Sequence, residues 1–369
     1  MIRIDEIYDH TFWPYFRRHI PFTKMFYCDP PGRSDAESLC NTSEETELNY
    51  IFFHDQEPIH LDIHAPLFNE VKRRGGTLNN YEGPNRAAII TSERDSATVE
   101  QVCSQNRWRP YYYFFHGWAA LDWYRGYDRT YLMPTPKERQ ITRSYISPNR
   151  IIGGRRQHRV LLMYHLLKRG INRAWVSFPE SCPVENINIL DIARAHQSKY
   201  PDIVDVFAQA ELPLNFPNET GHPMHSCWLS LFDECAETLA FVSTETVFEG
   251  RRHHLTEKSF KPICLRMPFV LVSTAGSLEY LRSYGFQTFD SIWDESYDTE
   301  TDDDQRLSKI ADLLHSLDQL TDAEKQAKFE QAIPIIEHNF NHFYSGAFEQ
   351  ILWKELVDML DTMQQDFAQ

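Results

Sequence analysis

The densest group of side chains that could do chemistry lies between residues 241 and 281. An apolar run leads into the acid Glu245, and Thr256, Glu257 and Lys258 follow after a basic loop. One carboxylate can accept both neighbouring hydroxyls of a ribose, while a lysine ammonium beside it contacts a phosphate. We therefore expect this stretch to bind a nucleotide.

The same stretch alternates between strand-like and helix-like segments. Leu239–Val242 and Phe269–Val272 read as strands, and helices are expected to begin at Thr256 and just after Gly276. In parallel sheets, ligands bind at the carboxyl ends of the strands, and helix N-termini supply N–H donors for anions. The pattern therefore predicts that the acid, the lysine and Gly276 meet at one edge of a parallel sheet.

A basic cluster precedes this stretch, and it ends at Arg159. Arg159 falls in the first turn of a helix predicted over Val160–Lys168, which Gly170 ends. A cation is unfavourable at this end of a helix dipole unless an anion shares the site. Two interpretations stay open: Arg159 neutralises a diphosphate, or the cluster is a solvated basic loop.

Two acids in the N-terminal part of the chain are candidate proton acceptors. The strand-like run Leu48–Phe53 is followed by His54, Asp55, Gln56 and Glu57. A buried strand fixes the geometry of the solvated loop that follows it, so Asp55 or Glu57 could take the proton from an acceptor hydroxyl. The alternative is that the acid only caps the next segment.

Apolar runs that alternate with helix-length segments predict an α/β fold with two domains. We expect an N-terminal, acceptor-side domain over residues 1–150 and a nucleotide-sugar-binding domain over 151–345, connected through Pro134–Gly154. Phe286–Phe289 reads as a short strand of the second domain. Residues 346–369 read as a helix that packs on the second domain or crosses back to the first.

Composition narrows the functional classes. The chain has 369 residues, 42% of them hydrophobic, and a net charge of −16, which argues against a broad nucleic-acid-binding surface. Seven cysteines without a Cys-x-x-Cys pair indicate reduced thiols in a cytoplasmic protein. No apolar run approaches the roughly 20 residues of a membrane span. The histidines and acids do not show metal-ligand spacing, so we expect no metal.

The sequence STETVFEGRRHHLTEKSFKPI resembles the donor-site motif of the α1,3-fucosyltransferase family. In that family an acid-containing Glu-Asn-Ser stretch precedes a Tyr-x-Thr-Glu-Lys element. Glu245 matches the first acid, and Thr256, Glu257 and Lys258 match the second element. Thr246 replaces the expected Asn, and His254 replaces the expected Tyr. The resemblance implies that these residues bind a nucleotide-sugar.

A second segment, HRVLLMYHLLKRG, is similar to the one that carries this family's diphosphate-binding arginine, here Arg159. More broadly, an ordered set of patches looks like a group of predicted glycosyltransferases of large tailed phages: HDQEPI, HGWAALDWYR, HRVLLMYHLLKRG, TEKSFKPI, MPFVLVSTAGSLEYLRSYGFQTF and DESYD. These patches span most of residues 50–300.

This resemblance implies two Rossmann-like domains facing across a cleft, the GT-B arrangement. It also implies an inverting, metal-independent transfer from a nucleotide-sugar, such as a UDP- or GDP-sugar. The acceptor would be a hydroxyl of a glycan, a small molecule or a hydroxymethylated base in phage DNA, in the host cytoplasm. The competing class is a non-catalytic nucleotide- or sugar-binding or assembly protein with the same two-domain shell.

Overall fold

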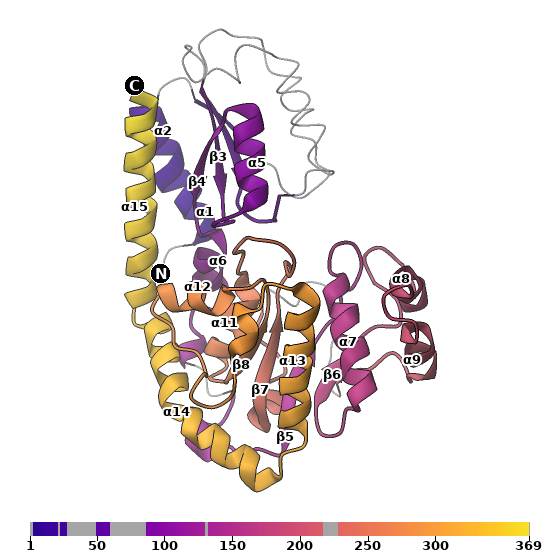
Figure 1. Cartoon of the computed structure of the whole chain (residues 1–369). Helices are drawn as coiled ribbons and strands as arrows, with labels where there is room; N and C mark the ends of the chain where they lie inside the picture. The colour runs from indigo at the N-terminus through magenta and orange to yellow at the C-terminus, as the bar shows by residue number, and fades with distance from the viewer. Residues whose placement is uncertain are drawn as a thin grey trace. The chain divides into compact units, whose positions relative to one another are not determined.

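The computed structural model describes most of the chain: residues 3–20, 23–27, 49–59, 86–129, 132–216 and 228–368. The chain forms two compact units. The first unit comprises residues 1–122, 251–254 and 349–369, and the second comprises residues 123–250 and 255–348. Each unit has its own four-stranded parallel sheet (Figure 1). The prediction of an α/β fold with parallel sheets is confirmed.

The first sheet has the strand order β1-β2-β3-β4, the same order as in the sequence. Its strands are β1 (Thr23–Tyr27), β2 (Asn49–His54), β3 (Arg86–Thr91) and β4 (Arg109–Tyr112). The side chains of residues 51–54 and 87–91 are buried. Strands covered on both faces read as continuous apolar runs, and for this reason β2 could be recognised from the sequence.

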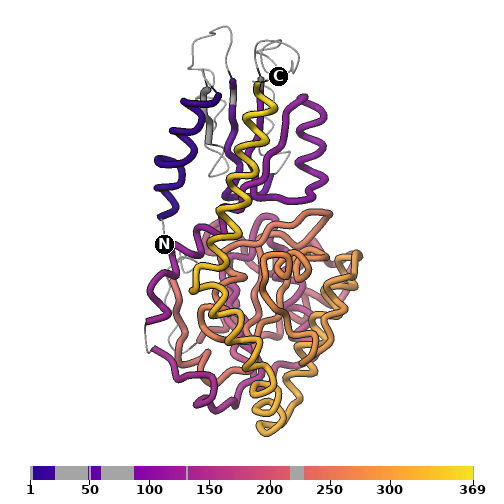
Figure 2. Tube along the Cα trace, turned by 90° about the vertical axis from the view of Figure 1, so that its left-hand side faces the viewer, coloured from indigo at the N-terminus to yellow at the C-terminus, as the bar shows by residue number. Residues whose placement is uncertain are grey.

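The helices of the first unit come from the N-terminal third and from the C-terminal end of the chain. They are α1 (Ile4–Ile7), the π-helix η1 (Tyr8–Phe12), α2 (Trp13–His19), α5 (Ala97–Asn106), α6 (Phe115–Trp123) and α15 (Ala347–Ala368). Tyr15 of α2 donates a hydrogen bond to the carbonyl of Leu360 in α15, at 2.9 Å. Figure 2 shows α15, at the yellow end of the chain, running beside the strands of this unit. From Glu349 onward, the C-terminal helix therefore packs as part of the first unit.

The second sheet has the order β6-β5-β7-β8. Its strands are β5 (Arg143–Pro148), β6 (Trp175–Ser177), β7 (Thr238–Thr244) and β8 (Phe269–Val272). The chain leaves β5 for β6 on one side and later returns to β7 on the other side of β5. A topological switch point therefore lies between β5 and β7, and doubly wound sheets bind their ligands outside the carboxyl ends of such strands.

The remaining helices of the described residues belong to the second unit. The α-helices are α7 (Gln157–Arg169), α8 (Ile189–His196), α9 (Ile203–Gln209), α10 (Phe232–Ala236), α11 (Glu257–Cys264), α12 (Ser277–Ser283), α13 (Asp303–Asp318) and α14 (Asp322–Tyr344). Single turns of 3-10 helix are η3 (Tyr127–Arg129), η4 (Pro136–Glu138) and η6 (Ser296–Thr299). Across the described residues, no helix is both long and apolar enough to cross a membrane.

Two predicted segments differ from the structure. The predicted connection, Pro134–Gly154, contains β5, a central strand of the second sheet. The first compact unit therefore ends at Asp122 in this part of the chain, and the second begins at Trp123. The predicted strand Phe286–Phe289 is irregular. Its backbone N–H groups are bound by side chains: the amide of Gln287 donates to Asn339, and the amide of Phe289 donates to Glu295.

Candidate functional site

Most of the predicted donor-binding residues meet at one place in the second unit. We call it the switch edge: the residues directly after β5 and β7, together with the first turns of α7 and α11. Arg159 lies in the first turn of α7, and Glu245 directly follows β7. Thr256, the N-cap of α11, and the two residues after it complete the set. The parallel-sheet rule thus brings together residues that lie far apart in sequence.

Glu245 is fully buried, and it anchors α11. Its carboxylate accepts hydrogen bonds from the backbone N–H of Thr256 at 3.0 Å and from the Thr256 hydroxyl at 2.6 Å. The Ser259 hydroxyl donates a third bond, at 2.5 Å. A carboxylate is favourable at a helix N-terminus because it complements the orphan N–H groups and the helix dipole. Glu245 therefore fixes the position of the Thr-Glu-Lys segment.

Arg159 joins the ends of the two central strands. Its guanidinium donates to the carbonyl of Ile151 at 2.8 Å, to that of Thr244 at 3.1 Å and to that of Glu245 at 3.2 Å. The side chain is 6% exposed. Burial lowers the pKa of Arg159 to about 10, and the carboxylates of Glu245 and Glu257 oppose this shift. The arginine thus places a buried positive charge at the switch edge, with these contacts made to the backbone.

Lys258 is the more accessible cation of the site. Its ammonium contacts the Thr256 hydroxyl at 3.1 Å and the Glu257 carboxylate at 2.9 Å. The Lys258 side chain is 28% exposed, compared with 5% for Glu257. A ligand arriving from solvent would therefore meet Lys258 first, while Glu257 is held behind it.

Gly276 forms the turn that opens α12. Its φ of +81° lies in the left-handed region, which glycine adopts without strain. The first N–H groups of α12 are used within the protein, because the Asp298 carboxylate accepts from Leu278 at 3.0 Å and from Glu279 at 3.4 Å. Burial raises the pKa of Asp298, and these backbone bonds oppose the rise. A phosphate at this helix would have to displace Asp298.

Two further buried side chains, which the sequence did not mark as candidates, contact residues that follow strands of this sheet. His158 contacts the Glu245 carbonyl at 3.1 Å, and its ring stacks on Phe248. Burial, with the neighbouring Arg159, lowers the pKa of His158 to about 3, so the ring is neutral. Arg306 of α13 is 1% exposed and donates to the carbonyl of Ser273 at 3.0 Å. The signal for Arg306 in the sequence is its place on the face of α13 that is apolar except for Asp318.

In the first unit, the two candidate proton acceptors follow β2 but differ in environment. Asp55 is 1% exposed, and it accepts a hydrogen bond from the Tyr8 hydroxyl of the π-helix η1. Burial raises the pKa of Asp55 to about 7, against the opposing effect of Tyr8. Glu57 is half-buried. An acceptor molecule could touch Glu57, whereas it could not reach Asp55 without a rearrangement.

Glu93, after β3, is a further buried acid at the same edge of the first sheet. Its carboxylate accepts from the Ser96 hydroxyl at 2.7 Å and from the backbone of Ile59, and Arg252 lies 3.5 Å away. Ser96 is close to Glu93 in the sequence, but Ile59 and Arg252 belong to distant segments. Its contacts indicate a residue that holds the loops of this unit together.

Within the part of the chain that the structure describes, no cluster of three or more His, Cys, Asp or Glu residues is arranged to hold a metal ion. Comparison of the chain with models of known protein families, with curated protein sequences and with solved structures gives no match. The resemblance to the α1,3-fucosyltransferase motif and to the phage group therefore stays a prediction.

Proposed function

We propose that the chain is a glycosyltransferase of the GT-B type, which moves a sugar from a nucleotide-sugar to a hydroxyl acceptor with inversion and without a metal. One observation carries this proposal: five of the predicted donor-binding residues form a connected group at the switch edge of a doubly wound sheet. These residues are Arg159, Glu245, Thr256, Glu257 and Lys258. Dinucleotides and related ligands bind at such edges in many unrelated sheets.

In this proposal the residues of the second unit have different roles in binding the donor. Lys258, the accessible cation, contacts the diphosphate, and Glu257 accepts the ribose hydroxyls once Lys258 turns to the phosphates. Arg159 adds a positive charge whose position is fixed, because hydrogen bonds to backbone carbonyls hold its guanidinium in place. Glu245 and Thr256 position the segment and do not touch the ligand.

The acceptor hydroxyl loses its proton to a carboxylate of the first unit. A general base must contact the proton it takes, so we assign this role to the half-buried Glu57 and keep Asp55 as the buried alternative. The acceptor oxygen forms the new bond to the anomeric carbon as the bond from that carbon to the diphosphate breaks. The nucleoside diphosphate leaves with the electron pair, which the lysine and arginine stabilise. The acceptor is a glycan, a small molecule or a hydroxymethylated base in DNA. The setting is the cytoplasm, which is that of the host if the protein is viral.

A specific observation also favours the second candidate, a non-catalytic nucleotide- or sugar-binding or assembly protein. The contacts of the Arg159 guanidinium and of the Glu245 carboxylate run to other parts of the protein, which suits a structural role. The two candidates differ in one measurable respect, because only a transferase releases nucleotide when acceptor is added.

Thermal shift with UDP-, GDP- and CMP-sugars tests donor binding. At about 100 times its Kd, the right donor stabilises the folded protein by about 2.7 kcal/mol. Lys258→Ala should abolish this shift without lowering the melting temperature of the free protein. Lys261→Ala, near the other end of the same helix, is the matched control and should keep the shift. If no nucleotide-sugar shifts the wild type, the result contradicts the transferase proposal. If Lys258→Ala behaves like the control, the donor site is elsewhere.

Nucleotide release then separates the two candidates. Glycan, small-molecule, and modified and unmodified DNA acceptors are each incubated with the donor that gives a shift. Glu57→Gln should bind the donor like the wild type and release no nucleotide. Normal release by Glu57→Gln combined with loss of release by Asp55→Asn would transfer the role to Asp55. A donor that binds but is never consumed with any acceptor favours the non-catalytic candidate.

A further inference from the structure

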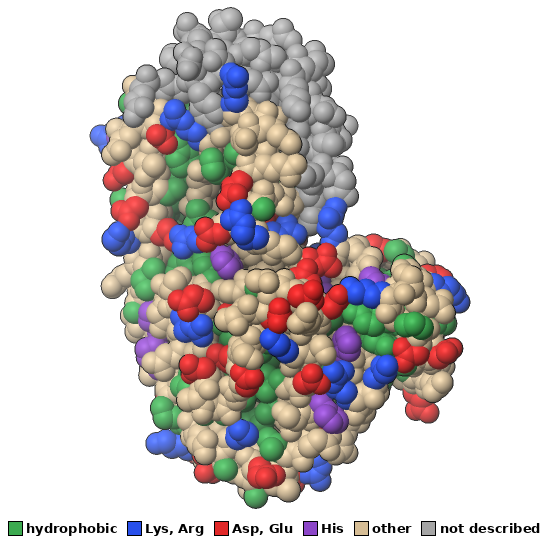
Figure 3. All heavy atoms as spheres, in the orientation of Figure 1, with side chains coloured by type: hydrophobic (Ala, Val, Ile, Leu, Met, Phe, Trp, Pro, Cys, Tyr) green, Lys and Arg blue, Asp and Glu red, His purple; other side chains and the backbone are tan. Residues whose placement is uncertain are grey.

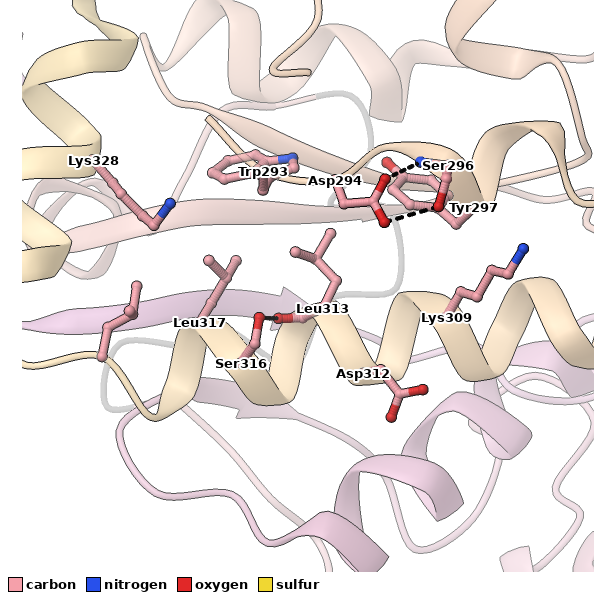
Figure 4. Close-up of a pocket in the computed structure, with 11 residues that line it drawn as sticks. Trp293, Asp294, Ser296, Tyr297, Lys309, Asp312, Leu313, Ser316, Leu317 and Lys328 are labelled. Atoms are coloured by element: carbon pink, nitrogen blue, oxygen red, sulfur yellow. Dashed lines mark hydrogen bonds between the residues drawn. The ribbon is translucent and has the colours of Figure 1, made fainter. Parts of the chain in front are cut away.

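A groove lies in the second unit, away from the residues of the switch edge. It runs between α13 and the segment that leads into η6, and Lys328 of α14 closes one end (Figure 4). Its volume is 420 Å³. This lies within the range of about 300–1,000 Å³ that is typical of small-molecule sites. The residues that line it include none of the predicted donor-binding residues.

The floor of the groove is apolar and partly aromatic. Trp293 and Tyr297 are buried on one side, and Leu313 and Leu317 lie opposite them on α13 (Figure 4). The indole nitrogen of Trp293 is buried and has no hydrogen-bond partner among the described residues. Figure 4 shows this nitrogen on the side of the ring that is turned away from Lys328. The floor is thus mainly apolar, and the indole N–H of Trp293 is buried within it without a partner in the described part of the chain.

The rim is polar, and its charges balance. The residues that line the groove include two acids, Asp294 and Asp312, and two lysines, Lys309 and Lys328. Each already has a partner: Lys309 is 2.8 Å from Glu300, and Lys328 donates to the carbonyl of Ile292 at 2.7 Å.

The acids are satisfied in the same way. Asp294 accepts from the backbone and the hydroxyl of Ser296, and Asp312 lies 2.8 Å from Arg169. Figure 3 shows the same mixing of acidic and basic side chains over the face of this unit. No excess charge remains to hold an ionic ligand.

A ligand that suits this groove is therefore neutral, has an apolar face and carries several hydroxyl groups. A sugar ring has these properties, because its C–H bonds pack on aromatic and leucine side chains while its hydroxyls bond to carboxylates and ammonium groups. We propose that the groove is a binding site for a neutral carbohydrate unit, separate from the nucleotide-sugar site. This site would bind a carbohydrate to the second unit whether or not the protein is a transferase.

The test monitors binding in the groove through a spectroscopic signal of Trp293. The protein contains eight tryptophans, so it is labelled with 5-fluorotryptophan, and the ¹⁹F resonance that disappears in Trp293→Phe is assigned to this residue. Glucose, galactose, mannose and N-acetylglucosamine are titrated, with inorganic phosphate and glucose 6-phosphate as charged controls. At least one neutral sugar should shift the Trp293 resonance saturably, and phosphate should not.

A matched pair of variants shows where the sugar binds. Ser316 lies on the rim, and its hydroxyl folds back to the Leu313 carbonyl, so Ser316→Phe fills the groove without opening the core. The control Gln209→Phe changes an exposed position of α9 outside the groove. Ser316→Phe should raise the Kd for the sugar by about tenfold or more, a loss of at least about 1.4 kcal/mol, and Gln209→Phe should leave it unchanged.

Three outcomes would overturn the proposal. They are a Trp293 resonance that no neutral sugar moves, a sugar shift that survives Ser316→Phe, and a response to phosphate alone. The result is independent of the donor site, because Ser316→Phe should leave the thermal shift with nucleotide-sugars intact. A Trp293 shift caused only by a nucleotide-sugar and lost in Lys258→Ala would instead make the groove a part of the donor site.

Discussion

The two sheets of the molecule each place an acid directly after a buried parallel strand, and the two acids have different surroundings. Glu245 follows β7 in the second unit, and Asp55 follows β2 in the first; both are at most 1% exposed. The Glu245 carboxylate accepts from one backbone N–H and two hydroxyls. Asp55 accepts from the Tyr8 hydroxyl, and burial raises its pKa to about 7.

The number and kind of donors therefore decide what a buried carboxyl group does. Three donors at the first turn of a helix make Glu245 an anchor for the segment that carries Lys258. A carboxyl in an apolar setting with fewer donors is left to titrate near neutral pH. The position after a strand was enough to mark both acids as candidates, but it could not distinguish these two roles.

The largest effect is expected for Asp55→Asn. Because the pKa of Asp55 is 3.8 in the unfolded chain and about 7 in the folded one, the folded state binds more protons between these values. The stability that this group contributes is full below about pH 4 and is lost as the pH rises through 7, a total of about 4 kcal/mol. Asn stays neutral, so the variant should lose this pH dependence, measured by urea unfolding from pH 4 to 8. Asp9→Asn, an exposed acid of η1, should keep the wild-type slope.

Glu245→Ala should destabilise the second unit by about 3 kcal/mol. The change leaves the Thr256 N–H and the hydroxyls of Thr256 and Ser259 without their acceptor inside the protein, which costs about 1–3 kcal/mol for each group left unpaired. Glu249→Ala, an exposed acid of the same loop, should change stability by less than about 0.5 kcal/mol. Chemical denaturation of both variants measures the difference. Equal stabilities would mean that Glu245 is not an anchor.

Arg159→Ala and Lys258→Ala separate anchoring from ligand binding at the same edge. Arg159 donates three hydrogen bonds to backbone carbonyls and is buried, so its removal should cost about 2 kcal/mol of stability. Lys258 is more exposed, and its removal should cost less than about 0.5 kcal/mol while weakening donor binding. The melting temperatures of the free variants provide the comparison. If Arg159→Ala is as stable as the wild type, this arginine is not an anchor, and we would then assign it to the residues that contact the ligand.

Much of the second unit could be predicted from local sequence. An uninterrupted apolar run predicted β8 with the bounds that the structure has, and Gly276 predicted the start of α12. The strand β5 was missed because its sequence, RSYISP, is partly polar. Its Ser144 is nevertheless buried, since its hydroxyl bonds to Asp318, which lies 174 positions later in the chain. Such a partner leaves no trace in a local pattern.

The same limit applies to the sites. That the acid after β7 and the Thr-Glu-Lys segment lie together follows from the geometry of a parallel sheet, so it was predictable. The groups that set the behaviour of each acid come from distant segments: Tyr8 lies 47 positions before Asp55, and Asp298 lies 20 positions after Leu278. Burial and donor number depend on these contacts, and neither is encoded near the acid itself.

Tyr8→Phe should have the smallest effect, and it tests the donor-number argument directly. The Tyr8 hydrogen bond lowers the pKa of Asp55, so removing the hydroxyl should move this pKa above 7. At pH 8, where Asp55 is ionised, the variant should be less stable by about 1 kcal/mol, the usual value of one hydrogen bond. ¹³C NMR of labelled aspartate carboxyl groups follows the titration, with the Asp55 signal assigned through Asp55→Asn.

The control for this last change is the double variant. Once Asp55 is replaced by Asn, the titration of Asp55 is removed, so adding Tyr8→Phe should not alter the dependence of stability on pH. If the Asp55 resonance titrates at the same pH with and without the Tyr8 hydroxyl, burial alone sets its pKa. The number of donors would then not explain why Asp55 and Glu245, which are equally buried, behave differently.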